Sequence, residues 1–231
     1  MIEKISMYGK LEKSKINSFL SVVILLCSLF IIYIVYRNNW IFPPLDFKEL
    51  MFLIVVLIFL PITYILIRYQ FLDKNEIGFT IGNSIWRTII IGIIAGLLPF
   101  ILSFLLLPKP SITTDSLEIF RSSFLSPIWE EFLFRSLLFS SLYIFLVDIL
   151  SGISSKKKQK KLNVIWIKKI NLISAVFFTV AIFTVAHADY SWSILLGSSS
   201  FTISFYFNRS IITPIIAHSI YNILVSIFII I

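Results

Sequence analysis

Residues 129–135, with the sequence WEEFLFR, place two acids and a base inside a long apolar run. A charged side chain near the centre of a bilayer costs a few kcal/mol, so such residues face the protein interior and are usually functional. Glu131 and Arg135 are four residues apart, which on a helix brings them to one face as an ion pair. Glu130 points about 100° away from Glu131, so it is the acid that lacks a local partner. This stretch predicts a helix buried within a membrane bundle.

The composition of the whole chain agrees with a membrane protein. Of its 231 residues, 58% are hydrophobic and only 14% are charged, and the mean hydropathy is +0.96. No soluble globular domain has this composition, whereas a polytopic membrane protein does. The single cysteine, Cys27, excludes an intramolecular disulfide and disfavours a thiolate metal site. We therefore expect an all-α fold.

Apolar runs predict a polytopic transmembrane helix bundle of about seven spans. Residues 1–115 contain the first three spans, and residues 116–231 contain the other four. The predicted spans are Ile16–Tyr36, the run between Glu49 and Arg68, the run between Arg87 and Lys109, residues 127–150, the run between Lys169 and Asp189, the run between Asp189 and Arg209, and Ser210–Ile231.

Two local signals concern how these helices begin and pack. Ser126 and Pro127 resemble an N-cap followed by a first-turn proline, which predicts that the fourth span begins there. Residues 116–125 then form either a short interfacial helix or a kinked extension of that span. In the third span, Gly92 and Gly96 have the GxxxG spacing that lets another backbone approach closely.

The distribution of Lys and Arg predicts the orientation in the membrane. With the N-terminus inside, the inner segments hold 15 of the 20 Lys and Arg, the outer segments hold 4, and Arg135 lies within a span. This bias predicts a cytoplasmic N-terminus. The lysine-rich segment 156–169 is a topology determinant that meets anionic lipid, so the positive net charge predicts a bilayer partner and no nucleic acid.

The two histidines of the chain both lie in apolar runs, and each has a notable residue one helical turn away. His187 follows Phe183 by four residues, and His218 precedes Asn222 by four. An intramembrane histidine by itself is as often an interhelical hydrogen-bonding group as a reactive one. His218 and Asn222 share a helical face, so two neutral donors can point at one spot.

Depth in the membrane tests whether these residues can meet. At about 1.5 Å per residue, His218 and Glu130 each lie roughly 13 Å from their membrane edges, so both fall near the midplane of a core about 30 Å thick. The same count places His187 roughly 10 Å too far outward, unless its span enters the membrane some residues after Lys169.

These motifs resemble those of a known family. Glu130-Glu131-x-x-x-Arg135, Phe183-x-x-x-His187 and His218-x-x-x-Asn222 are similar to the three motifs of the CAAX protease and bacteriocin-processing (CPBP, or Abi) family of intramembrane glutamic endopeptidases. The resemblance covers residues 116–231, and the first three spans carry no family motif.

The resemblance implies a role for each residue of the three motifs. Glu130 and His187 would activate a water, and His218 and Asn222 would bind the oxyanion. Glu131, Arg135 and Phe183 would support the site. It also implies a catalytic core in residues 116–231 and a hydrolase that needs no cofactor or metal. The substrate would be a membrane-associated peptide or protein, processed as in CAAX maturation or in bacteriocin maturation or immunity. A bacterial plasma membrane fits such a small chain.

Other chemistries remain open. Zinc could bind Glu130, His187 and His218, although the HExxH helix of metalloproteases is absent. A serine protease could pair His218 with the segment Gly197–Ser200, and a Gly-Asp signature of aspartic intramembrane proteases is absent. A transporter would explain the acids but not the paired His and Asn. A catalytically silent relative could serve as a membrane scaffold or immunity protein. The sequence predicts no oligomeric state.

Overall fold

The computed structural model describes residues 77–82, 84–106, 116–147, 164–187 and 192–230, together with scattered positions between 53 and 75. Regular structure in these segments is helical throughout, and none of the described residues lies in a strand. The all-α prediction is therefore confirmed for this part of the chain. The elements are α4 (Ile85–Leu106), α5 (Ser116–Phe120), η2 (Arg121–Leu125), α6 (Ser126–Glu131), η3 (Phe132–Phe139), α8 (Val164–His187), α9 (Trp192–Asn208) and α10 (Ile212–Ile230).

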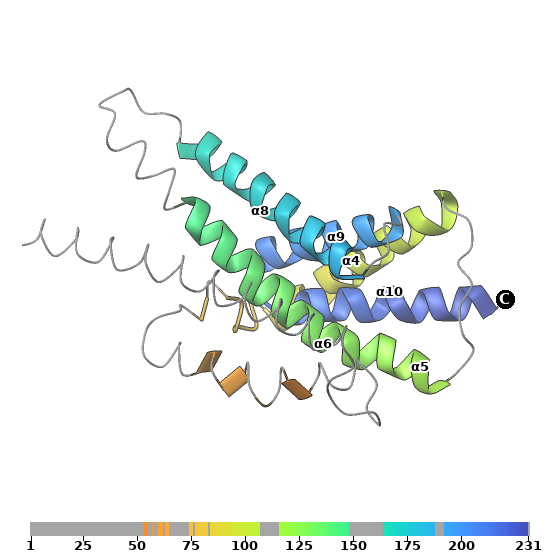
Figure 1. The fold of residues 1–231 in the computed structure, drawn as a ribbon. Helices are drawn as coiled ribbons and strands as arrows, with labels where there is room; N and C mark the ends of the chain where they lie inside the picture. The colour runs from red at the N-terminus through yellow and green to blue at the C-terminus, as the bar shows by residue number, and fades with distance from the viewer. Residues whose placement is uncertain are drawn as a thin grey trace, which may run out of the picture.

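These helices form one bundle (Figure 1). Helix α4 packs mainly against α10 and α9, and α8 packs against α9 and η3. Helix α10 also contacts α6 and η2. The element that carries the WEEFLFR stretch is thus placed between α8 on one side and α10 on the other.

The contact between α4 and α10 depends on the two glycines of the GxxxG pattern. A Cβ atom at Gly96 would collide with the backbone of Ala217, and one at Gly92 would lie 2.9 Å from the side chain of Ile216. Neither distance leaves room for a methyl group. The predicted close approach of another backbone at this GxxxG segment is therefore confirmed, and the partner is α10.

The helix that carries the acids is continuous, which corrects the prediction that it begins at Ser126 and Pro127. Residues 116–147 are helical without interruption, and the residue before Ser126 already has α-helical backbone angles. Segment η2, just before Pro127, is π-helical, and the Ser126 N–H bonds to the Arg121 carbonyl five residues back. A proline ring clashes with the preceding turn of an α-helix, and the wider π turn relieves that clash. Residues 116–125 are therefore the extension of this helix.

Two described helices are long and apolar enough to cross a membrane, namely Ile85–Leu105 and Lys169–His187. The apolar stretch of α10, Ile212–Phe228, is shorter. Helix α9 has 17 residues, about 26 Å at 1.5 Å per residue, and the fourth predicted span carries Glu130, Glu131 and Arg135. Two of the seven predicted spans, the third and the fifth, thus correspond to helices long enough to cross a membrane, and the total of seven is not confirmed. The predicted first span, Ile16–Tyr36, and residues 156–163 of the lysine-rich segment lie outside the described residues, whereas Lys168 and Lys169 belong to α8.

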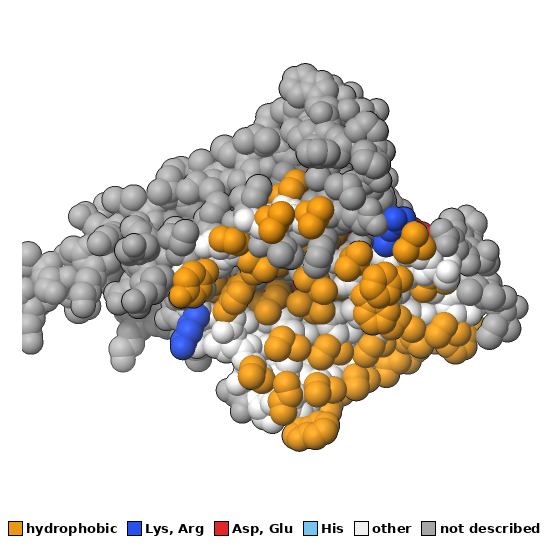
Figure 2. Space-filling model, turned by 90° about the horizontal axis from the view of Figure 1, so that it is seen from below, with side chains coloured by type: hydrophobic (Ala, Val, Ile, Leu, Met, Phe, Trp, Pro, Cys, Tyr) orange, Lys and Arg blue, Asp and Glu red, His pale blue; other side chains and the backbone are white. Residues whose placement is uncertain are grey.

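The charged stretch lies in the interior of the bundle, and the outer surface of the bundle is apolar. Every residue from Trp129 to Ser136 is buried, so this helix is surrounded by its neighbours on all sides. Exposed hydrophobic residues instead cover α4, α8 and α9, among them Trp86, Phe104 and Phe177. Figure 2 shows a surface whose described side chains are mostly hydrophobic, with its few Lys and Arg near the edges. An apolar exterior around a buried charged stretch is the pattern of a helix bundle in lipid.

Candidate active site

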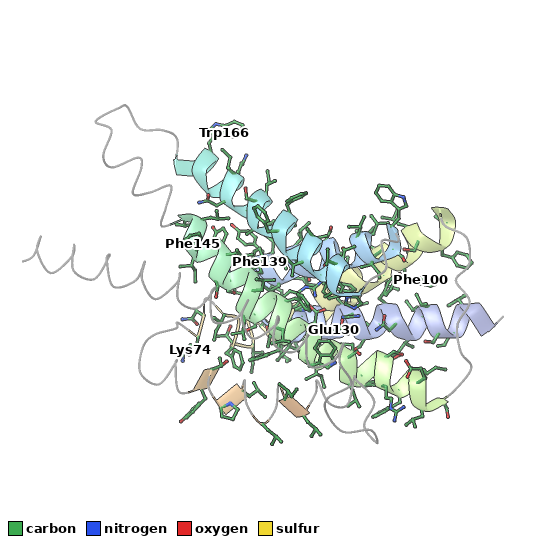
Figure 3. The ribbon with its side chains drawn as sticks, in the orientation of Figure 1. Lys74, Phe100, Glu130, Phe139, Phe145 and Trp166 are labelled. Carbon is green, nitrogen blue, oxygen red and sulfur yellow. The ribbon has the colours of Figure 1, made fainter. Side chains whose placement is uncertain are left out.

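Three helices bring one acid and two histidines together in the bundle interior. Glu130 is on α6, His187 is the last residue of α8, and His218 is on α10. Glu130 Oε2 lies 3.3 Å from His187 Nε2 and 3.9 Å from His218 Nε2. Figure 3 shows Glu130 in the middle of the bundle. The predicted meeting of Glu130 with His218 is found in the structure.

His187 also reaches Glu130, although counting residues along its helix placed it too far outward. Helix α8 runs obliquely to α10 (Figure 1), so its residues advance less along the bundle than those of an upright helix. The His187 Nδ1–H donates to the Phe183 carbonyl at 2.8 Å. The two rings also pack together, with centroids 4.1 Å apart. Phe183 therefore fixes the imidazole so that Nε2 faces Glu130.

Glu131 connects the second histidine to the predicted ion pair. Its Oε2 lies 3.1 Å from Arg135 Nε, and its Oε1 accepts a hydrogen bond of 2.8 Å from His218 Nδ1. Glu131 and Arg135 are completely buried. Breaking a buried pair leaves an uncompensated charge in an apolar interior, which is strongly unfavourable. The Glu131–Arg135 pair therefore fixes the His218 ring through its Nδ1, on the side away from the cavity.

Arg135 has further partners that the sequence did not identify. Its Nη2 donates to the hydroxyl of Ser198 at 2.9 Å and lies 3.3 Å from the Ser198 carbonyl. Its Cζ lies 4.4 Å from the centre of the Phe183 ring, a cation–π distance. Phe201, one turn after Ser198, stacks on His218 with centroids 5.0 Å apart. The only sequence signal for this contribution of α9 is its small polar run, Gly197–Ser200.

These contacts bear on the serine-protease alternative. The Ser198 hydroxyl binds Arg135, and the Ser200 hydroxyl donates to the Ala95 carbonyl at 2.8 Å. His218 directs its two nitrogens at Glu131 and Glu130. Ser198 and Ser200 therefore act in this structure as hydrogen-bonding residues that connect α9 to its neighbours.

Asn222 lies one turn beyond His218 on α10. Its Nδ2 donates to the carbonyl of Ser122 at 2.7 Å, which ties α10 to the π-helical segment η2. An amide NH2 group has two donors, so one hydrogen remains for another acceptor. The residue therefore has a structural contact and still lines the site.

A cavity of about 240 Å³ joins these groups. At about 30 Å³ per water molecule, it has room for several waters or for a peptide group. Glu131 and Arg135 do not line it and lie behind the histidines. The lining residues are Ser122, Ser126, Glu130, Phe183, His187, Ser193, Ile194, Gly197, Ser198, Phe201, His218, Tyr221 and Asn222.

The fold and the site together define an all-helical bundle with a buried acid–histidine cluster at a polar cavity. Residues 112–224 match the family model described as Rce1-like, type II CAAX prenyl endopeptidase. Over this segment the chain matches the CPBP family, a membrane-embedded family of peptidases, and the recognition made from the three motifs is confirmed there. No match was found among curated proteins or among solved structures.

Proposed function

We propose that this protein is an intramembrane endopeptidase that hydrolyses a peptide bond with a water molecule activated by Glu130 and His187. The family match supports the peptidase class. The observation that carries the mechanism is the convergence of two imidazole nitrogens, from His187 and His218, on one oxygen of Glu130 beside a cavity. An acid between two imidazoles is suited to moving protons.

The hydrogen bonds of His187 suggest how water is activated. Its Nδ1–H is used by the Phe183 carbonyl, so a neutral His187 presents a bare Nε2 to Glu130. Nε2 of His187 and Oε2 of Glu130 are 3.3 Å apart, and two unprotonated acceptors would repel each other at this distance. The contact is favourable when one proton lies between the two atoms. With this proton on His187, the carboxylate of Glu130 is free to take another from water.

The reaction then balances with these two groups alone. Water transfers a proton to Glu130 while its oxygen bonds to the substrate carbonyl carbon, and the carbonyl oxygen becomes an oxyanion. When the C–N bond breaks, the leaving nitrogen receives a proton from Glu130 or His187. With that transfer the pair again holds one proton, and the new carboxylic acid gives its own proton to the product amine or to water.

His218 and Asn222 would stabilise the oxyanion. Since His218 Nδ1–H donates to Glu131, its Nε2 can donate only when the ring is an imidazolium. In that form the donor at His218 would be charged rather than neutral, and the carboxylate of Glu131 would stabilise it. Asn222 would add its second amide hydrogen. Donors held in place before charge develops are the main source of such stabilisation.

The substrate that fits this site is a membrane-associated peptide or protein. Its processing would resemble either CAAX maturation or bacteriocin maturation and immunity. We place the protein in a bacterial plasma membrane with the N-terminus in the cytoplasm, on the distribution of Lys and Arg.

Zinc is the competing chemistry, because Glu130, His187 and His218 are the ligand types of a catalytic zinc site. Among the described residues, no group of three or more His, Cys, Asp and Glu is placed to hold a metal ion. The proposal is for direct activation of water by Glu130 and His187, and metal analysis of the active protein distinguishes the two.

The test uses the full-length protein in nanodiscs, a peptide library that includes prenylated C-termini, and mass spectrometry of the products. We expect a defined cleavage that is absent with Glu130→Gln and retained with Glu118→Gln, which removes the same charge earlier on the same helix. Absence of any cleavage by folded wild-type protein would favour a silent scaffold or immunity protein. Equal cleavage by wild type and Glu130→Gln would refute the mechanism.

A further inference from the structure

Arg209 occupies a backbone position that usually belongs to glycine. It directly follows α9 with a φ of 51°, in the left-handed region that glycine adopts most easily at helix ends. Its N–H donates to the Phe205 carbonyl at 2.7 Å, and its own carbonyl accepts from Thr80 Oγ1 at 2.9 Å. An arginine held in a strained conformation indicates a use for its guanidinium group.

Two tyrosine rings hold this guanidinium. Its Cζ lies 4.8 Å from the centre of the Tyr206 ring and 5.4 Å from that of Tyr143. Packing against rings occupies the faces of the planar guanidinium. Tyr143 also forms a side-chain hydrogen bond with Arg209. The other N–H groups on the edge of the guanidinium are suited to binding an anion with two oxygens.

A cavity of about 530 Å³ lies beside Arg209. Among the described residues, its lining contains no acid and includes Asn75, Thr80, Tyr143, Asn208 and Arg209. Asn208 is 98% buried, its Nδ2 binds Thr88 and Thr213, and its Oδ1 has no hydrogen-bond partner among the described residues. The guanidinium of Arg209 suits an anionic group, and the buried acceptor Asn208 Oδ1 suits a hydroxyl on the same ligand.

A second, apolar cavity shares the lining residue Phe207 with the first. It has a volume of about 390 Å³ and lies between α4 and α9, lined by Ile91, Leu98 and Leu102 on one side and Leu196 and Ile203 on the other. From Phe207 to Leu196 the groove follows α9 for about 16 Å at 1.5 Å per residue, a length that suits an acyl chain.

The place of the polar cavity in the bundle fits the head group of a lipid. In Figure 3, Lys74 and Phe145, sequence neighbours of the lining residues Asn75 and Tyr143, lie on the side of Glu130 away from α5. The Lys and Arg bias predicts that this end, with Arg87 and Arg209, faces the cytoplasm. Anionic lipids of that leaflet attract basic residues at the membrane edge.

We propose that the two cavities together bind one anionic phospholipid. Its phosphate lies at the edge of the Arg209 guanidinium, a head-group hydroxyl donates to Asn208 Oδ1, and one acyl chain lies in the α4–α9 groove. The site is separate from the Glu130 cavity, with which it shares no lining residue.

The experiment titrates the purified full-length protein in detergent with phosphatidylglycerol or with phosphatidylcholine of the same chains. Thermal unfolding reports binding, because a ligand of the folded state raises its melting temperature, and native mass spectrometry counts the retained lipids. We expect phosphatidylglycerol to stabilise more than phosphatidylcholine and to saturate at one molecule. Arg209→Gln should weaken this binding about tenfold, the loss of one charge-assisted contact.

Controls separate a specific site from general attraction to a basic edge. Arg87→Gln removes the same charge at an exposed position of the same end and should leave the preference unchanged. Arg209→Gly removes the guanidinium while relieving the left-handed strain, so its loss of binding cannot come from misfolding. An unchanged lipid preference in Arg209→Gln and Arg209→Gly would overturn the proposal. Full stabilisation by inorganic phosphate or by dihexanoyl phosphatidylglycerol would also overturn it, because neither occupies the groove.

Discussion

Glu131 Oε1 accepts a hydrogen bond from His218 Nδ1 at 2.8 Å, and this contact connects an internal ion pair to the cavity of the site. Arg135 lies 3.1 Å from the other oxygen of Glu131 and is anchored on Ser198 of α9. The two adjacent acids therefore have different surroundings. Glu130 faces the cavity between two imidazoles, whereas Glu131 is enclosed by partners.

The first prediction concerns Glu130. We expect Glu130→Gln to abolish peptide hydrolysis while the melting temperature changes little, because glutamine keeps the shape of the side chain but cannot accept a proton from water. Turnover and thermal unfolding of the same preparation measure both effects. Glu118→Gln is the matched control and should retain turnover. Wild-type turnover by Glu130→Gln would contradict the assigned role.

Glu131 should behave in the opposite way with respect to stability. Glu131→Gln removes the charge that compensates Arg135 and weakens the hold on His218, so we expect a loss of about 3 kcal/mol or more in the free energy of unfolding. Thermal or denaturant unfolding measures the loss. An unfolding free energy equal to that of Glu118→Gln would show that Arg135 needs no partner at position 131.

Much of this site could be predicted from residue spacing. Spacings of four residues identified the pair Glu131–Arg135 and the ring contact of Phe183 with His187, because neighbours on a helix are set by its period alone. The GxxxG segment likewise predicted a close helix contact. These are all local relationships or properties of one helix face.

What the sequence did not predict depends on three-dimensional packing. A Ser-Pro pair usually marks the start of a helix. Here the π-helical turn before Pro127 accommodates the proline inside a longer helix. The contact of His187 with Glu130 depends on the inclination of α8. Counting residues assumes that this helix is parallel to the bundle axis. Ser198 and Phe201 contribute through α9, and no spacing within α9 relates them to Arg135 or His218.

Metal analysis tests whether water is activated by Glu130 and His187 directly. We expect purified active protein to contain no stoichiometric zinc, and chelators to leave its turnover unchanged. A catalytic zinc would instead be present at one equivalent and would be lost together with activity. Restoration of activity by added zinc would reverse the assignment and make Glu130, His187 and His218 metal ligands.

The last prediction concerns Asn222, whose amide both binds the Ser122 carbonyl and lines the cavity. If it stabilises charge that appears only in the transition state, Asn222→Ala should lower kcat about 100- to 1,000-fold with a smaller effect on substrate binding. If it serves only to tie α10 to η2, the melting temperature should fall and the folded fraction should keep its rate.

Single-turnover rates of the folded fraction distinguish these roles. Asn208→Ala is the matched control, because that buried amide ties α9 to Thr88 and Thr213, and none of these three residues lines the Glu130 cavity. It should lower the melting temperature and leave the rate unchanged. Because His218 and Asn222 would serve one oxygen, the double variant should lose less than the sum of the two single losses. A normal rate in Asn222→Ala would count against the oxyanion role and leave the bond to Ser122 as the function of this amide.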